Sequence, residues 1–171
     1  MSPEERIRRQ LIVRQAEGYL ELGMPRHALD ALCRWRDAES QSSRALYLRG
    51  EALRMLDRYD EALIWLDRAA ELLPDDIHVC LAQGWCHKRT GQIHLAIESL
   101  CRARAIDPSD PLVHYNLACY WSLARNKRLA LEHLARALDK NAHFREHAHE
   151  ESDFDFVRDD PRFQSLTSVI V

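Results

Sequence analysis

The sequence contains few of the residues that build β-sheets. Among its 171 residues, Val, Ile and Thr together number 16, whereas Leu numbers 24 and Ala 20. Side chains that branch at Cβ favour strands, while Leu and Ala favour helices. This shortage of strand formers argues against a β-rich fold, and we expect an all-α protein without a sheet.

The sequence also lacks the charge and the apolar runs that direct a chain to nucleic acid or to a membrane. Its 24 basic and 27 acidic residues give a net charge of −3, so no positive field gathers phosphate groups. No run of 18 apolar residues occurs, and the charged start Met-Ser-Pro-Glu-Glu-Arg is unlike a signal peptide. We expect a cytoplasmic protein that binds neither nucleic acid nor membranes.

Motifs for catalysis, cofactors and metals are missing as well. The 5 glycines form no phosphate-binding loop, and no serine stands in a nucleophile motif, so we expect neither an enzyme nor a cofactor. No Cys-x-x-Cys pair occurs, which argues against a disulfide framework and a zinc site. The cysteines are therefore predicted to be free thiols within helices; they are Cys33, Cys80, Cys86, Cys101 and Cys119.

One cluster, near the C-terminus, has possible metal ligands. It consists of His143, His147, His149, Glu150 and Glu151. On a helix, His143 and His147 share one face and could present their imidazoles to one ion. Two ligands do not make a site, so no metal is expected and the segment is interpreted as a solvated linker.

What the sequence does contain is a repeat of 34 residues. Its clearest copy consists of Gly84, Gly91, Ala96, Leu100, Ala103 and Pro108, and the copy before it of Gly50, Asp57, Ala62, Leu66, Ala69 and Pro74. The template extends backwards through Ala16, Gly23, Ala28 and Leu32, and forwards through Ala118, Arg125, Ala130, Leu134 and Ala137. A period of this length is typical of helix–turn–helix arrays.

The spacing resembles the tetratricopeptide repeat (TPR) family, in which a small residue in the first helix is followed by a turn and a spaced alanine, large apolar residue, alanine and proline. The resemblance implies a right-handed α-solenoid of about four helical hairpins within residues 1–142, at about 9–42, 43–76, 77–110 and 111–142. Asp153 to Phe163 resembles the end-of-array segment of bacterial members. We therefore expect residues 143–171 to cap the last hairpin through Phe154, Phe156 and Phe163.

Three tryptophans bear on this template. Trp35 stands where the other repeats have alanine, so the first repeat is predicted to be splayed or to have an irregular connection at Glu39 to Ser43. Trp121 is predicted to lie in the core. Trp65 is expected to face outward, where a large apolar ring would favour a homodimer.

In TPR arrays one face of each first helix lines a concave groove, and the resemblance implies the same here. The groove residues would be Val13, Tyr47, Leu81 and Tyr115, then Glu17, Glu51, Trp85 and Cys119, and then Leu20, Arg54, Lys88 and Ser122, with Arg89 beside them. Glu17 and Glu51 would make the N-terminal half acidic, and Lys88 would make the third repeat basic. An equal alternative is that Tyr47 and Tyr115 only pack between helices.

The resemblance implies a non-catalytic protein–protein interaction scaffold that binds a peptide in this groove. We expect Trp85 to be the main contact for a peptide that has an apolar anchor beside an acidic residue, with basic ligand residues near Glu17 and Glu51. A secretion-type chaperone for an unfolded apolar segment and a self-assembling scaffold are alternatives with the same fold. One TPR subclass grips the C-terminal carboxylate of chaperones with Lys and Asn. This chain has Glu17 and Glu51 in that region, which would repel a carboxylate, so that role is not expected.

Overall fold

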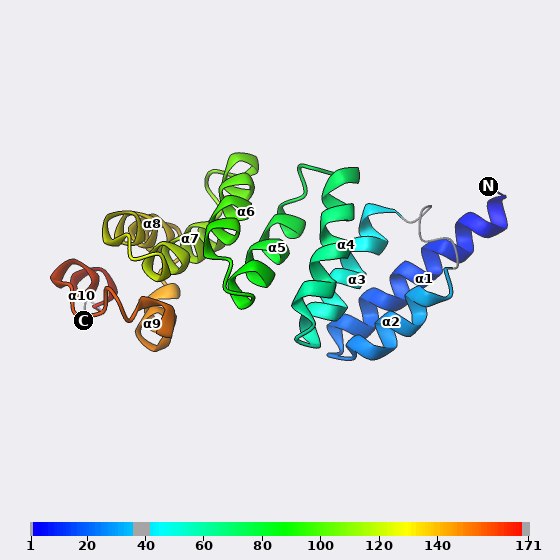
Figure 1. Cartoon of the computed structure of the whole chain (residues 1–171), viewed down its shortest axis with the longest axis horizontal. Helices are drawn as coiled ribbons and strands as arrows, with labels where there is room; N and C mark the ends of the chain where they lie inside the picture. Colours follow the sequence, from blue (N-terminus) through cyan, green and yellow to red (C-terminus); the bar gives the residue numbers. More distant parts are fainter. Residues whose placement is uncertain (1, 36–41, 169–171) are drawn as a thin grey trace. The chain divides into compact units, whose positions relative to one another are not determined.

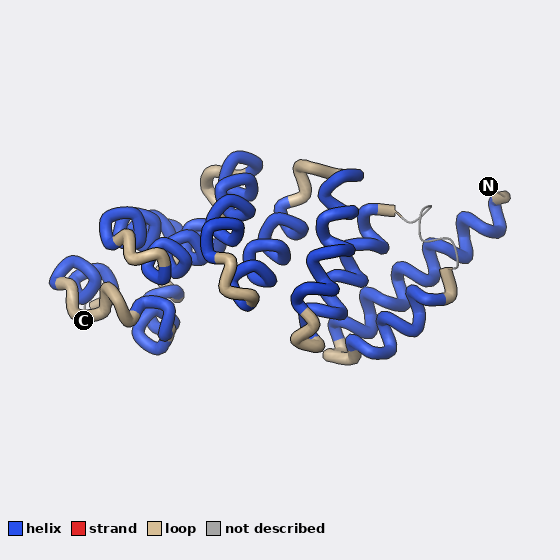
Figure 2. Tube along the Cα trace, in the orientation of Figure 1, coloured by secondary structure: helices blue, strands red, loops and turns tan. Residues whose placement is uncertain are grey.

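The computed structural model describes residues 2–35 and 42–168, and most of them are helical (Figures 1 and 2). No β-strand occurs within these residues, which confirms the predicted all-α class. The chain divides into two compact units, Met1–Thr90 and Gly91–Val171. Among the helices of the described ranges, none combines the length and the apolar character that crossing a bilayer requires.

The described residues of the N-terminal unit form five α-helices packed in two layers. They are α1 (Pro3–Glu21), α2 (Pro25–Cys33), α3 (Ser43–Met55), α4 (Tyr59–Leu72) and α5 (Ile77–Arg89). Each helix packs on the next, and α1 with α3 and α3 with α5 are also in contact. The helices α1, α3 and α5 therefore form one layer, and α2 and α4 cover it from the other side.

Small residues allow these layers to approach closely. Ala16, Ala28, Ala62 and Ala69 are fully buried, as the repeat template requires. The core around them forms three clusters, the first with Ile12, Leu32, Trp35 and Leu48, the second with Leu53, Leu63, Leu66 and Cys86, and the third with Leu46 and Val79. Burying these apolar stripes stabilises helices that would be marginal alone.

The turn inside each repeat has the same backbone conformation every 34 residues. The φ angle is 68° at Gly23, 58° at Asp57, 77° at Gly91 and 58° at Arg125. This left-handed region costs glycine nothing, whereas it strains residues with a Cβ atom. The repeat therefore fixes the turn geometry even where the residue is not glycine.

Three glycines of the N-terminal unit should respond differently to alanine. Gly23→Ala should lower the free energy of unfolding by about 1 kcal/mol, because its φ is positive. Gly50→Ala should cost about 1–3 kcal/mol, because its Cβ would lie 2.6 Å from buried Leu66. Gly18→Ala, in open space within α1, should instead add about 0.5–1 kcal/mol. Urea denaturation checks the three signs, and a destabilised Gly18→Ala would contradict this interpretation.

The C-terminal unit contains the remaining helices. They are α6 (Ile93–Ile106), α7 (Pro111–Leu123), α8 (Lys127–Lys140), α9 (Phe144–Glu150), the 3-10 helix η2 (Ser152–Phe154) and α10 (Pro161–Thr167). Asp110 accepts hydrogen bonds from the backbone at the start of α7, and Asp160 does the same at the start of α10, so both act as N-caps. Helix α7 packs against α6, α8 and η2, and α10 packs against α8 and α9.

The segment after α8 packs against α7 and α8, but not through all the residues expected to do so. Phe154, Val157 and Phe163 are buried, and the rings of Phe154 and Phe163 lie 5.5 Å apart. The prediction for Phe156 is wrong, because its side chain is 39% exposed. The guanidinium of Arg125 lies over its ring at 5.3 Å.

Trp35 does not stand in the alanine position of the repeat, although the sequence alignment of the repeats implied that it would. Helix α2 ends at Cys33, so the indole does not occupy the helical position that alanine fills in the other repeats. Instead it is buried in the first core cluster, with the guanidinium of Arg9 over its ring at 4.9 Å. Most of the predicted irregular connection lies outside the described residues.

The other two tryptophans also differ from expectation. Trp65 is half-buried against the core, and Arg49 and Arg68 lie over its ring at 4.7 and 5.3 Å. Trp65 therefore packs against the core instead of facing outward as expected, and it gives no support for a homodimer. Trp121 is half-buried rather than fully buried.

Candidate functional site

The layer formed by α1, α3 and α5 contains a pocket of about 370 Å³. Its lining consists of Glu17, Leu20, Glu21, Arg44, Tyr47, Leu48, Glu51, Met55 and His78. Four of these, Glu17, Leu20, Tyr47 and Glu51, belong to the groove predicted from the sequence. The structure therefore brings predicted residues of two repeats together around one hollow, and it adds Arg44 and His78.

Tyr47 lines this pocket. Its half-buried ring packs against all three core clusters of the N-terminal unit. The Arg44 guanidinium lies 5.3 Å over the ring, and the His78 ring is 6.4 Å away. Burial, and secondarily the charge of Glu51, raises the pKa of Tyr47 to about 12, so the hydroxyl stays protonated at neutral pH.

The two predicted acidic residues are paired with arginines. Arg44 of α3 forms an ion pair of 2.6 Å with Glu17 of α1, and Arg54 donates two hydrogen bonds of 2.9 Å to Glu51. The prediction of an acidic N-terminal half is therefore wrong. Arg44 could have been recognised from its position three residues before Tyr47 on the same helical face.

Trp85 lies on α5 and is 39% exposed. The Arg54 guanidinium and the Lys88 ammonium lie 5.7 and 5.4 Å from its ring, within the range of cation–π attraction. Arg89 stands over the ring of Tyr59 on α4, at 5.3 Å. Trp85 thus presents an aromatic surface whose neighbours are basic.

A second pocket, of about 480 Å³, lies at the start of α1. Its lining consists of Arg6, Arg9, Gln10, Val13, Arg14, Glu17, Trp35 and Ser42. Glu5 pairs with Arg9 at 2.7 Å, but no ion pair joins Arg6 or Arg14 to an acidic side chain in the described part of the chain. Among the described residues, Arg6 and Arg14 therefore add positive charge to the lining of this pocket.

The predicted groove residues differ in their access to solvent. Trp85 and Arg89 are exposed; Val13, Glu17, Tyr47, Glu51, Arg54, Leu81 and Lys88 are half-buried; Tyr115 and Cys119 are buried. Phe144 stacks on Tyr115 at 4.6 Å, and Phe154 meets its edge at 5.6 Å. Tyr115 and Cys119 are therefore not available to a ligand, and we leave them out of the site.

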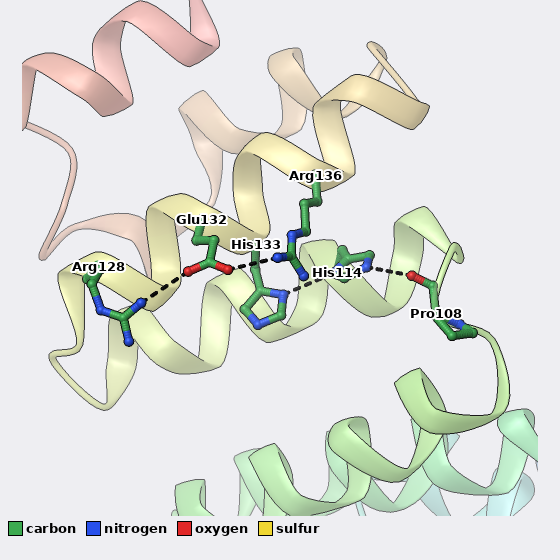
Figure 3. Close-up of polar contacts among 6 residues, drawn as sticks. All are labelled: Pro108, His114, Arg128, Glu132, His133 and Arg136. Atoms are coloured by element: carbon green, nitrogen blue, oxygen red, sulfur yellow. Dashed lines mark hydrogen bonds and ion pairs between the residues drawn. The ribbon is translucent and has the colours of Figure 1, made fainter.

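Two buried histidines of the C-terminal unit were not singled out from the sequence. The Nδ1 atoms of His114 on α7 and His133 on α8 lie 2.9 Å apart, and His114 Nε2 lies 2.9 Å from the carbonyl oxygen of Pro108 (Figure 3). A carbonyl only accepts, so His114 must carry its proton on Nε2. His133 then donates from Nδ1 to His114. Burial first, and His114 second, lower the pKa of His133 to about 4.

The histidines near the C-terminus do not converge on a metal site. His149 Nε2 lies 3.0 Å from the carbonyl oxygen of Thr167. Across residues 2–35 and 42–168, no three His, Cys, Asp or Glu side chains gather closely enough to hold a metal ion. The five cysteines are free thiols, and burial raises the pKa of Cys86 to about 12.

Comparison with protein-family models identifies the repeat. Two models described as tetratricopeptide repeat match the sequence, one over residues 13–77 and the other over residues 77–110. Together they span more than half of the chain. No curated protein sequence matches it.

Several solved structures share the fold. The structure of MamA 41-end from Desulfovibrio magneticus RS-1 is 22% identical, with 93% of this chain and 89% of that chain covered and a TM-score of 0.77. MamA AMB-1 is 16% identical, with 94% and 87% covered and a TM-score of 0.75. YrrB, described as a TPR protein with an unusual peptide-binding site, is 25% identical, with 80% and 71% covered and a TM-score of 0.70. These similarities confirm the α-solenoid class.

Proposed function

Because the chain belongs to the tetratricopeptide repeat family, we propose that it is a non-catalytic scaffold that binds a peptide on the layer formed by α1, α3 and α5. The observation that carries the proposal is the position of Tyr47 and Trp85. Both rings are accessible on this layer, and the former borders a pocket of about 370 Å³. Aromatic side chains dominate the binding energy of protein interfaces.

Trp85 is the proposed anchor for the peptide. An indole offers a large contact area and one N–H donor, and it loses little entropy when it is fixed. Lys88, whose ammonium lies 5.4 Å from the ring, favours an acidic ligand residue beside the anchor, whereas Arg54 is already paired with Glu51.

The charges favour acidic ligand residues at the α1 end as well. Glu17 and Glu51 are already paired with arginines, so they do not attract basic residues as the sequence suggested. Arg6 and Arg14 instead leave positive charge beside the second pocket. We therefore propose an acidic peptide with apolar anchors.

A self-assembling scaffold is the second candidate. Ile7 and Leu11 lie one turn apart on α1, and both are exposed. Such a pair favours a further contact at the start of the array. Light scattering over a tenfold range of concentration distinguishes this candidate, because a mass that stays at that of the monomer would remove it.

Selection from a displayed library of random dodecapeptides tests the peptide-binding proposal. Trp85→Ala should weaken binding of the selected peptides by about 2 kcal/mol, roughly thirtyfold, and leave the melting temperature nearly unchanged. Fluorescence anisotropy measures the Kd. Ile64→Ala is the control, because Ile64 is 60% exposed on α4, outside the binding layer. Equal affinity of both variants would contradict the proposal, and a Trp85→Ala protein that melts several degrees lower would place Trp85 in the core.

A further inference from the structure

Tyr47 and Tyr115 stand at the same position of the repeat, 68 residues apart. Both follow the start of the first helix of their repeat, Tyr47 on α3 and Tyr115 on α7. Aromatic rings cover Tyr115, whereas Tyr47 lines an open pocket. The arrangement at Tyr115 therefore indicates which kind of side chain suits the pocket at Tyr47.

At Tyr115 the cover comes from the chain itself. Phe144 stacks on the ring with an interplanar angle of 22°, and Phe154 meets it edge to face at 82°. Edge-to-face and offset stacked pairs are the preferred arrangements of aromatic rings. Both phenylalanines belong to the segment that follows the last repeat, so this is a peptide held against the first helix of a repeat.

At Tyr47 no phenylalanine covers the ring. In the described part of the chain, the only aromatic ring paired with Tyr47 is that of His78, at 6.4 Å. The pocket beside it has apolar walls from Leu20, Leu48 and Met55. Ion pairs neutralise two of the three carboxylates that line the pocket, those of Glu17 and Glu51, and Glu21 is the third. The pocket therefore suits an uncharged side chain.

We propose that the pocket beside Tyr47 binds a phenylalanine or other aromatic side chain of an acidic peptide, in the way that Phe154 lies against Tyr115. This inference rests on the proposed peptide-binding function and specifies its ligand: an aromatic residue enters at Tyr47, and acidic residues flank it. Leu81 and Val13 occupy the same repeat position on α5 and α1, so Tyr47 is the one aromatic platform of the N-terminal unit at this position.

The probe is a synthetic peptide of residues 150–160, with the sequence Glu-Glu-Ser-Asp-Phe-Asp-Phe-Val-Arg-Asp-Asp. It contains both phenylalanine and acidic residues. Labelled with fluorescein, it should bind the full-length protein in an anisotropy titration. The same peptide with alanine at both phenylalanine positions should bind at least tenfold more weakly. No binding of the phenylalanine peptide at millimolar protein concentration would overturn the inference.

Two variants locate the contact. Tyr47→Ala should weaken binding of the probe at least tenfold, whereas Tyr47→Phe should keep it, because the ring and not the hydroxyl forms the platform. Since Tyr47→Ala also removes core contacts, Met55→Trp provides a second test. Met55 is exposed at the rim of the pocket, and an indole there should fill the hollow and weaken binding about tenfold. Ile64→Trp, outside the pocket, is the matched control and should bind like the wild type.

The failure of this inference can be told apart from that of the proposed function. If Trp85→Ala weakens the probe but Met55→Trp and Tyr47→Ala do not, the binding layer stands and the aromatic pocket is overturned. If none of the three changes affects the probe, both proposals are overturned. If the Met55→Trp protein loses the probe while the Ile64→Trp protein binds it like the wild type, both proposals are supported.

Discussion

Phe154→Ala should lower the free energy of unfolding of the C-terminal unit by about 3–5 kcal/mol. Its side chain is fully buried, and its ring contacts those of Tyr115 and Phe163 at 5.6 and 5.5 Å. The change removes the centre of the aromatic cluster that covers α7, and rigid neighbours cannot fill the cavity. Urea denaturation followed through hydrogen exchange of the α7 amides measures the loss.

Phe156→Ala is the matched control, since this phenylalanine lies two residues away but is largely outside the core. It should cost less than about 1 kcal/mol, the size of an exposed cation–π contact with Arg125. Removing residues 143–171 altogether should expose Tyr115 and raise aggregation. If the truncated protein were to melt at the temperature of the full chain, the capping role of this segment would be refuted.

Acid should destabilise the C-terminal unit between about pH 6.5 and pH 4, through His133. An unfolded histidine binds its proton near pH 6.5, whereas in the folded protein the pKa of His133 is lowered to about 4. The unfolded state therefore binds more protons within this window, and stability falls as the pH falls. The difference amounts to roughly 3 kcal/mol at the acidic end, at 1.36 kcal/mol for each pKa unit.

The surroundings of His133 explain why its cation is disfavoured. Its Nδ1 faces His114, and Arg104 and Arg136 add positive charge, which the nearby Glu132 only partly offsets. Glu132 is itself engaged by Arg128 at 3.2 Å and by Arg136 at 2.9 Å (Figure 3). A proton on His133 would therefore place an uncompensated charge between α7 and α8.

His133→Asn should remove this acid dependence. Asparagine retains an N–H donor for His114 but does not titrate. Its free energy of unfolding should change little between pH 6.5 and pH 4, while His147→Asn, at an exposed position on α9, should behave like the wild type. Chemical denaturation at each pH gives both profiles, and the same acid loss in His133→Asn would assign the effect to other groups.

The sequence by itself determined the helices, the turns and the family of the repeat. These features depend on contacts within a repeat of 34 residues, where a small residue, a turn and an alanine recur at fixed spacing. The turns at Asp57 and Arg125 show this, because both adopt the positive φ of the equivalent glycines. The repeat boundaries proposed at residues 42, 76 and 110 stay a prediction.

The sequence also indicated much of the candidate site, because equivalent positions on α1, α3 and α5 face the same side of one layer. This placed Glu17, Tyr47 and Glu51 together, as the pocket shows. It did not find their arginine partners. An ion pair between helices depends on the orientation of long side chains, for which the repeat contains no signal.

Only the tertiary structure decided which equivalent residues are open to a ligand. Tyr47 and Tyr115 stand at equivalent positions of the repeat. The segment after the last repeat covers Tyr115, whereas Tyr47 lines a pocket. The tertiary structure likewise decided that His114 pairs with His133 and that Trp35 is buried. The physical reason is that a repeat specifies its own helices and turns, whereas burial depends on which non-repeated segment packs against each copy.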